Sequence, residues 1–140
     1  MRNLSALAIG LLVMGLGLYG AAAVTPLAYP AAFDGSGATG NAVALFVMLS
    51  ITEVATLFAG WLTARLVSDH RPGHAILMAS LGLASAVLVG AIRWGVAPSW
   101  YYIASWMLMP VMALLGARAW ERTERRSRDA ATRRLLLTGK

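Results

Sequence analysis

The sequence predicts an all-α integral membrane protein: a four-helix bundle with both termini cytoplasmic and a basic helical C-terminal tail. Of its 140 residues, 59% are hydrophobic and only 13% are charged, whereas soluble domains average about 25% charged residues. The apolar residues form four long runs, and the basic residues fall almost entirely on one side if these runs cross a membrane. Lipid is therefore the predicted surroundings of most of the surface.

The first apolar run predicts a transmembrane helix at about residues 4–24. Three alanines at residues 21–23 resemble a signal-peptide cleavage site. The run is nevertheless longer than the roughly 7–15 apolar residues of a signal peptide, so we expect the helix to be retained. Residues 25–41 contain Pro26, Pro30 and several glycines, which break helices, so this segment is predicted to be a loop.

Three further apolar runs predict helices at about residues 42–66, 75–93 and 100–120. The transmembrane domain then covers residues 1–120. Short polar connections, at residues 68–73 and around Pro98, should make neighbouring helices antiparallel. Pro110 lies inside the fourth helix and removes a backbone donor, so a kink is expected there.

Orientation follows from the basic residues. With both termini inside, 11 of the 12 arginines and lysines lie on the cytoplasmic side and only Arg93 lies outside. Such an imbalance strongly directs membrane topology. Aromatic residues agree, because Trp94 and Trp100 fall at the predicted outer interface and Trp61 and Trp120 at the inner one. We expect a multi-pass protein of a bacterial inner membrane.

Small residues predict helix contacts. Gly10 and Gly17 share one side of the first helix, and Gly82 and Gly90 share one side of the third, with Ala86 between them. Small residues let helix backbones approach closely in lipid. Contacts within the bundle are the favoured interpretation, and contacts between subunits are the alternative.

Glu53 is the one charged residue inside the second run, about eleven residues from either end. A charge near the bilayer centre costs at least about 2.5 kcal/mol. Thr56 and Thr63 lie on the same narrow polar stripe, which should face the bundle interior or a partner protein. Arg93 should lie more than about 10 Å from Glu53 along the helix axis, so direct pairing is not expected.

Two explanations of Glu53 remain open. It either binds a proton or cation in a small transporter, or it is a protonated or hydrogen-bonded carboxyl that locks helices or holds a partner subunit. We favour the second, because no other titratable group is expected at the same depth.

Nothing in the sequence predicts an enzyme, a cofactor or a metal site. The chain has no cysteine and contains no HExxH, GxSxG or phosphate-loop motif. His70 and His74 are four residues apart, but Pro72 between them disfavours the helix that would join them at a metal. The methionines around Pro110 are expected to fill gaps or face lipid: Met107, Met109 and Met112.

The tail at residues 121–140 is predicted to be a basic helix. From Arg118 onward there are eight basic and three acidic residues. Anionic lipid headgroups attract each such cation by about 1 kcal/mol. Nucleic acid is disfavoured as a partner, because no aromatic platform accompanies the arginines. The residues expected to contact headgroups or a partner are Arg122, Arg125, Arg126, Arg133 and Arg134.

Two parts of the sequence resemble known membrane proteins. The segment 60–66 (Gly-Trp-Leu-Thr-Ala-Arg-Leu), followed by His74, residues 98–100 (Pro-Ser-Trp), Pro110 and residues 116–118 (Gly-Ala-Arg), resembles small four-helix bacterial inner-membrane proteins of uncharacterised function. This resemblance implies no activity. Residues 52–54 (Thr-Glu-Val) resemble the membrane glutamate segment of small multidrug-resistance exporters, although the glutamate is here in the second helix instead of the first.

The predicted function is a non-catalytic accessory or scaffold subunit of a larger membrane complex. Its expected partners are membrane lipids and other membrane subunits or a second copy of itself. The alternative is a small oligomeric proton-coupled transporter that uses Glu53.

Overall fold

The fold is an all-helical bundle, seen in a computed structural model that describes residues 2–67 and 71–138. In chain order its elements are α1 (Arg2–Ala28), the short 3-10 helix η1 (Pro30–Ala32), α2 (Ala42–Leu66), α3 (Arg71–Ile92) and α4 (Ser99–Thr138). The four α-helices of the described residues are each long and apolar enough to cross a membrane. The prediction of a multi-pass, all-α membrane protein is therefore confirmed.

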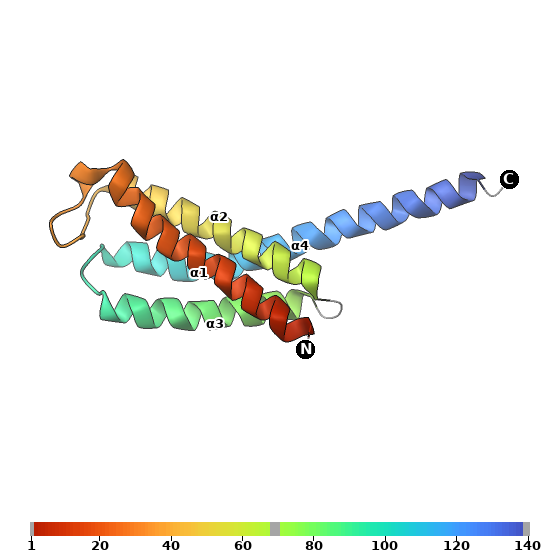
Figure 1. The fold of residues 1–140 in the computed structure, drawn as a ribbon, viewed down its shortest axis with the longest axis horizontal. Helices are drawn as coiled ribbons and strands as arrows, with labels where there is room; N and C mark the ends of the chain where they lie inside the picture. The colour runs from red at the N-terminus through yellow and green to blue at the C-terminus, as the bar shows by residue number, and fades with distance from the viewer. Residues whose placement is uncertain (1, 68–70, 139–140) are drawn as a thin grey trace.

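The chain passes back and forth along the bundle, so that α2 and α4 run parallel to each other and antiparallel to α1 and α3 (Figure 1). The loop between α1 and α2 and the connection between α3 and α4 lie together at one end, which we call the loop end. The N-terminus lies at the opposite end. There α4 leaves the bundle and continues as an arm, residues 121–138, so we call this the arm end.

Helix α2 is the central element and packs most extensively against α4 and α1. The outward faces of the helices are apolar; Leu12, Leu16, Val54 and Leu88, for example, are exposed. Lipid tails suit such faces, because they present no unpaired backbone group and little charge. The interior instead contains alanine, methionine and threonine side chains.

The contact between α2 and α4 depends on glycine. A Cβ atom built on Gly60 would overlap the carbonyl group of Ala113, and one built on Gly116 would overlap the carbonyl oxygen of Leu57. The two backbones thus touch directly at both positions. Close approach of this kind is how membrane helices gain packing energy where lipid supplies no hydrophobic drive.

Two predicted loop boundaries are wrong. Helix α1 continues through Pro26 to Ala28, although residues 25–41 were expected to be a loop. Pro26 removes one hydrogen bond from the last turn, because it has no N–H to donate to the carbonyl of Ala22. The helix nevertheless continues for two residues, and the N–H of Tyr29 closes the turn on the carbonyl of Thr25 at 2.9 Å. Helix α3 already begins at Arg71, because the fixed φ of Pro72 suits the first turn of a helix.

Helix α4 is continuous from the bundle into the arm. It spans 40 residues and includes Pro110, with no break at residue 120, where the sequence analysis ends the transmembrane helix. Figure 1 shows its direction changing between the part packed in the bundle and the arm. The arm therefore extends a helix that is already formed and packed in the bundle, so it does not need to nucleate as an isolated helix.

The loop between α1 and α2 is held by a single acidic side chain. One carboxylate oxygen of Asp34 accepts hydrogen bonds from the Ser36 hydroxyl at 2.6 Å, the Ser36 N–H at 2.9 Å and the Ala38 N–H at 2.8 Å. The N–H of Thr39 then donates to the Val96 carbonyl at 3.0 Å, which fixes the loop to the connection between α3 and α4.

Acid is expected to loosen this loop. The hydrogen bond from the Ser36 hydroxyl, followed by that from the Ala38 N–H, holds the pKa of Asp34 below its ordinary value of 3.8. Because that pKa is lowered, the ionised Asp34 carboxylate stabilises the folded loop at pH values above the ordinary pKa. This stabilisation is lost as the pH falls through the pKa of the folded state. In micelles, the Ser36 and Ala38 amide signals should shift only below about pH 3.8. The Asp34→Ala variant should lack this transition, and a transition at higher pH would contradict the assignment.

Candidate functional site

The candidate site is centred on Glu53, whose side chain is only 4% exposed and lies inside the bundle. Thr52, Thr56 and Thr63 on the same helix are also buried. The polar stripe of α2 therefore faces the bundle interior, one of the two orientations that the sequence analysis allows. Among the described residues, neither carboxyl oxygen of Glu53 has a hydrogen-bond partner.

The neighbouring threonines do not help Glu53, because their hydroxyls donate elsewhere. The hydroxyl of Thr52 donates to the Met48 carbonyl at 2.9 Å, and that of Thr56 donates to the Thr52 carbonyl at 2.9 Å. The Thr63 hydroxyl donates to the sulfur of Met78 at 3.2 Å. A buried carboxyl without partners is unusual, and such a group ordinarily signals a functional role or an associated water or ion.

A cavity of about 120 Å³ lies among all four helices on the loop side of Glu53. Tyr19 of α1, Met48 of α2 and Ala86 of α3 contribute to its wall. Its polar side chains come from Tyr19, Arg93, Tyr101, Tyr102 and Ser105. The hydroxyl of Tyr102 donates to the Arg93 carbonyl at 2.8 Å.

Glu53 lies near the level of the inner end of this cavity, although it is not itself one of the wall residues. Leu49 of α2 packs against Tyr101 of α4 at the cavity wall. Because α2 and α4 run parallel, one further turn leads from Leu49 to Glu53 and from Tyr101 to Ser105. Ser105 lines the cavity, and Tyr101 is close enough to Glu53 to interact with it electrostatically.

A second hollow, of about 570 Å³, lies at the surface of the loop end. The α1–α2 loop forms one side of it, including Asp34, and the α3–α4 connection forms the other. Val96 and Ala97 belong to the walls of both the surface hollow and the cavity. The two spaces are thus neighbours that share part of a wall, and Glu53 lines neither of them.

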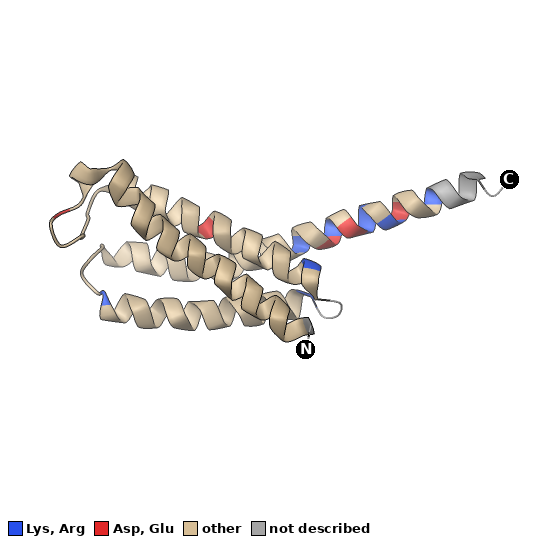
Figure 2. Ribbon diagram, viewed as in Figure 1, with Lys and Arg blue, Asp and Glu red and all other residues tan. Residues whose placement is uncertain are grey.

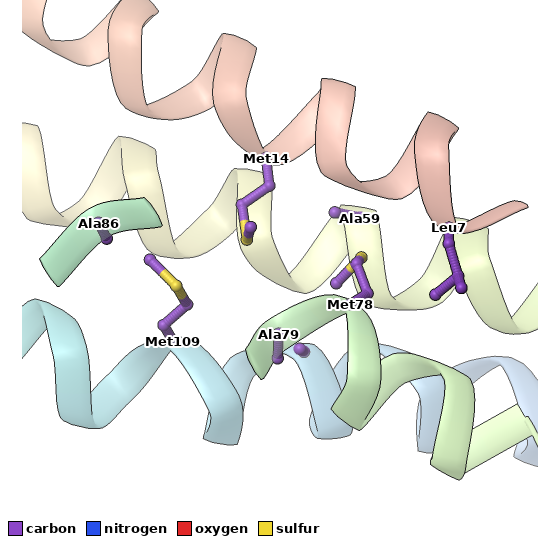
Figure 3. Packing of buried hydrophobic residues seen from close by; sticks show 8 residues of the cluster. Leu7, Met14, Ala59, Met78, Ala79, Ala86 and Met109 are labelled. Atoms are coloured by element: carbon purple, nitrogen blue, oxygen red, sulfur yellow. The ribbon is translucent and has the colours of Figure 1, made fainter. Parts of the chain in front are cut away.

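On the arm side of Glu53 the interior is apolar and closely packed (Figure 3). The side chains of Met14 from α1 and Met109 from α4 point towards each other across the bundle. A Cβ atom placed on Gly82 of α3 would lie 2.9 Å from the Met14 sulfur and 3.8 Å from the Met109 sulfur. The methionines thus fill the space that glycine leaves. The residues of this cluster are Leu7, Met14, Ala59, Met78, Ala79, Ala86, Met109 and Ala113.

The glycines selected from the sequence lie at contacts inside the bundle. Gly10 faces Thr63 and Met78, and Gly17 faces Ala55. Gly82 faces Met14, and Gly90 faces the ring of Trp106, whose Cζ2 atom would lie 2.8 Å from an added Cβ. These stripes are therefore already used in folding a single copy of the chain.

Outside the site, charge is concentrated on the arm, while the bundle carries little (Figure 2). Glu124 pairs with Arg71 of α3, whose Nη2 donates to its carboxylate at 3.2 Å, and with Arg128 at 2.7 Å. Closer to the bundle, the Arg65 guanidinium lies 5.4 Å from the Trp61 ring centre and 5.6 Å from that of Trp120. These contacts fix the start of the arm.

Beyond Glu124 the arm is exposed. Arg122, Arg125, Arg126 and Arg133 all have exposed side chains. Their spacing of i, i+3, i+4 and i+11 places them on one side of the helix. Arg134 belongs to the helix, but its side chain lies outside the described residues.

The other sequence candidates do not come together. Met107 is 69% exposed, while Met109 is buried in the core. His70 lies outside the described residues, and His74 lies in the first turns of α3. Within residues 2–67 and 71–138, no three histidine, aspartate or glutamate side chains are arranged to hold a metal ion.

Sequence reasoning missed two features. It did not assign Gly60 and Gly116 to the α2–α4 contact, although Ala64 follows Gly60 by four residues and Ala113 precedes Ala117 by four. That repeat of small residues was an available signal. It also missed the cavity, because no pattern in one helix shows where four helices fail to fill space.

Comparisons with known proteins add no assignment: no protein-family model matches the chain, and neither a curated protein nor a solved structure shows significant similarity to it.

Proposed function

We propose that this protein is a non-catalytic accessory or scaffold subunit of a larger complex in a bacterial inner membrane, and that its arm binds the partner. Both termini and the arm lie on the cytoplasmic side in this proposal, because 11 of the 12 basic residues then do so. The observation that carries the proposal is the continuation of α4 well beyond the bundle.

The glycine-rich and polar faces of the bundle helices are already buried inside the bundle. The glycine stripes contact other helices of the same chain, and the polar stripe around Glu53 faces inward. What remains outside is apolar and suits lipid. On the cytoplasmic side, a partner that recognises more than lipid-facing side chains therefore meets the arm.

The arm has the geometry of a docking element. From Glu124 to the end of α4 at Thr138 it extends about 21 Å at 1.5 Å per residue. Every described side chain from Arg125 to Arg133 is exposed. A free helix of this length is only marginally stable in water, so a bound partner would stabilise it.

The charge of the arm favours an acidic protein surface on the same side of the membrane. Arg122, Arg125, Arg126 and Arg133 form a basic side, with Asp129 among them. Trp61 and Trp120 mark the depth of the membrane interface. Arg133 lies about 14 Å beyond Glu124 along the helix, farther than the roughly 10 Å over which salt screens charge, so lipid headgroups attract it only weakly.

Charge reversal on the arm tests this proposal. The Arg126→Glu/Arg133→Glu double variant should lose the larger subunits that co-purify with the wild-type chain after gentle detergent extraction, because each change places like charges together across the interface. Native mass spectrometry measures the complex. The Arg93→Glu variant changes a charge at the loop end and should retain the complex.

The proposal fails if the wild-type chain extracts without any further subunit, or if both variants behave like it. A homo-oligomer that binds lipophilic cations would instead support the alternative, a small proton-coupled transporter. The carboxyl of Glu53, which has no hydrogen-bond partner in the part of the chain that the structure describes, favours that alternative, since a membrane-embedded carboxyl can exchange a proton for a substrate.

A further inference from the structure

We propose that Glu53 is a proton-binding site that exchanges protons with one side of the membrane only, the side of the loop end, through the surface hollow and the cavity. This inference goes beyond the scaffold proposal. It would supply the proton site of the transporter alternative, but it does not require that anything be transported.

The buried carboxyl of Glu53 needs a partner. Glu53 is only 4% exposed, and its carboxyl oxygens have no hydrogen-bond partner among the described residues. A bare carboxylate at this depth is costly, so the group must gain a proton or water. A proton taken from a hydronium ion neutralises it and leaves a water molecule.

The cavity has room for water molecules. Liquid water occupies about 30 Å³ per molecule, so the cavity of about 120 Å³ has room for a few water molecules. It is too small for a typical ligand pocket of about 300–1,000 Å³. Hydroxyl groups of Tyr19 and Ser105 belong to its wall and can hydrogen-bond to water.

The route from the cavity to the surface lies at the loop end. The cavity extends from Arg93 at the end of α3 to Ala86, seven residues deeper, or about 10 Å along the helix. At its outer end it shares Val96 and Ala97 with the surface hollow. Asp34, which belongs to that hollow, is exposed and has a lowered pKa because the Ser36 hydroxyl binds it, so it is negative at neutral pH and attracts cations.

The barrier lies on the other side of Glu53. Towards the arm end, the interior is filled by Met14, Met78 and Met109. The backbones of α2 and α4 touch at Gly60 and Gly116 so closely that even a Cβ atom would overlap the opposite carbonyl. Water is not stable in such an apolar, closely packed layer.

The charged and titratable groups around this path are few. Tyr19 comes from α1, Arg93 from the end of α3, and Tyr101 and Tyr102 from α4. Asp34 lies at the outer hollow. Helix α2 contributes Glu53 alone. Glu53 is therefore the only acidic group of the described residues at the inner end of the path.

Single cysteines test the route, since the natural chain has no cysteine to interfere. Ser105→Cys places a thiol in the cavity at the level of Glu53. Thr63→Cys is the control, because Thr63 is also buried, at 0% exposure against 7% for Ser105, but lies in the closely packed layer beside Gly10 and Met78. A membrane-impermeant, charged methanethiosulfonate is added separately to the two faces of the membrane, using spheroplasts and inverted vesicles.

The Ser105→Cys protein should react from the loop side at least about tenfold faster than from the arm side, and at least about tenfold faster than Thr63→Cys from either side. Equal reaction from both sides, or no reaction at Ser105→Cys, overturns the inference. Both variants should keep the wild-type helical circular dichroism, which shows that they fold.

Infrared spectroscopy gives a second measurement on the natural glutamate. A carboxylic acid carbonyl band that is absent in Glu53→Gln should shift after transfer to D₂O; because D₂O crosses lipid freely, this shift measures whether water reaches the carboxyl, while the cysteine variants measure from which side. A band that never exchanges overturns the inference. Absence of transport in liposomes, with cysteine access intact, would count against the transporter alternative and not against this path.

Discussion

Replacing Gly60 with alanine is expected to destabilise the bundle by about 3 kcal/mol, the upper end of the usual cost of overpacking a core. The added Cβ atom would overlap the Ala113 carbonyl, which belongs to the backbone of α4. A backbone cannot rotate away as a flexible side chain can, so α2 and α4 must separate. Titration with a denaturing detergent, followed by circular dichroism, measures the loss.

The matched control is Gly15→Ala in α1. A Cβ atom on Gly15 has no neighbour within 4 Å, so the substitution meets only lipid. Alanine is favoured over glycine inside a helix by about 1 kcal/mol, and this variant should be as stable as the wild type or slightly more so. If Gly60→Ala unfolds at the same detergent fraction as Gly15→Ala, the close contact between α2 and α4 does not exist.

Replacing Glu53 with leucine is expected to stabilise the protein by about 1–3 kcal/mol, the cost of a buried polar group without a partner. The carboxyl oxygens make no hydrogen bond within the described residues, so leucine loses no contact with another side chain and removes a polar group from the interior. The same detergent titration measures the gain. Natural proteins retain such costly groups where function needs them.

A glutamine at position 53 tests whether the stability change in the leucine variant comes from the loss of the polar group or from the change in side-chain shape. Glu53→Gln keeps the size and the polar atoms of the side chain, and it should leave stability within about 1 kcal/mol of the wild type because its amide is equally unpartnered. A leucine variant that is clearly less stable than the glutamine variant would show that the carboxyl has a stabilising partner, and the path to the loop end would then lose its starting point.

Sequence reasoning allowed two positions for the polar stripe around Glu53, the bundle interior or a surface that faces a partner, and the structure has the first. Sequence reasoning failed at the ends of helices. Pro26 and Pro72 both read as breakers, yet each lies in a terminal turn of a helix. Pro72 fits the first turn of α3, where an N–H group has no helical partner. Pro26 removes a hydrogen bond from the last turn of α1, and that helix ends two residues later at Ala28.

The sequence by itself determined the solvent and the number of helices, because the length and apolarity of each run decide whether it can cross lipid without neighbours. Only the tertiary structure decided which glycines touch and where space remains. Gly60 meets α4 while a Cβ atom on Gly15 would meet nothing within 4 Å, and the cavity lies on the loop side of Glu53. These features depend on how four helices fit together, and the sequence of a single helix does not determine which surface will pack against it.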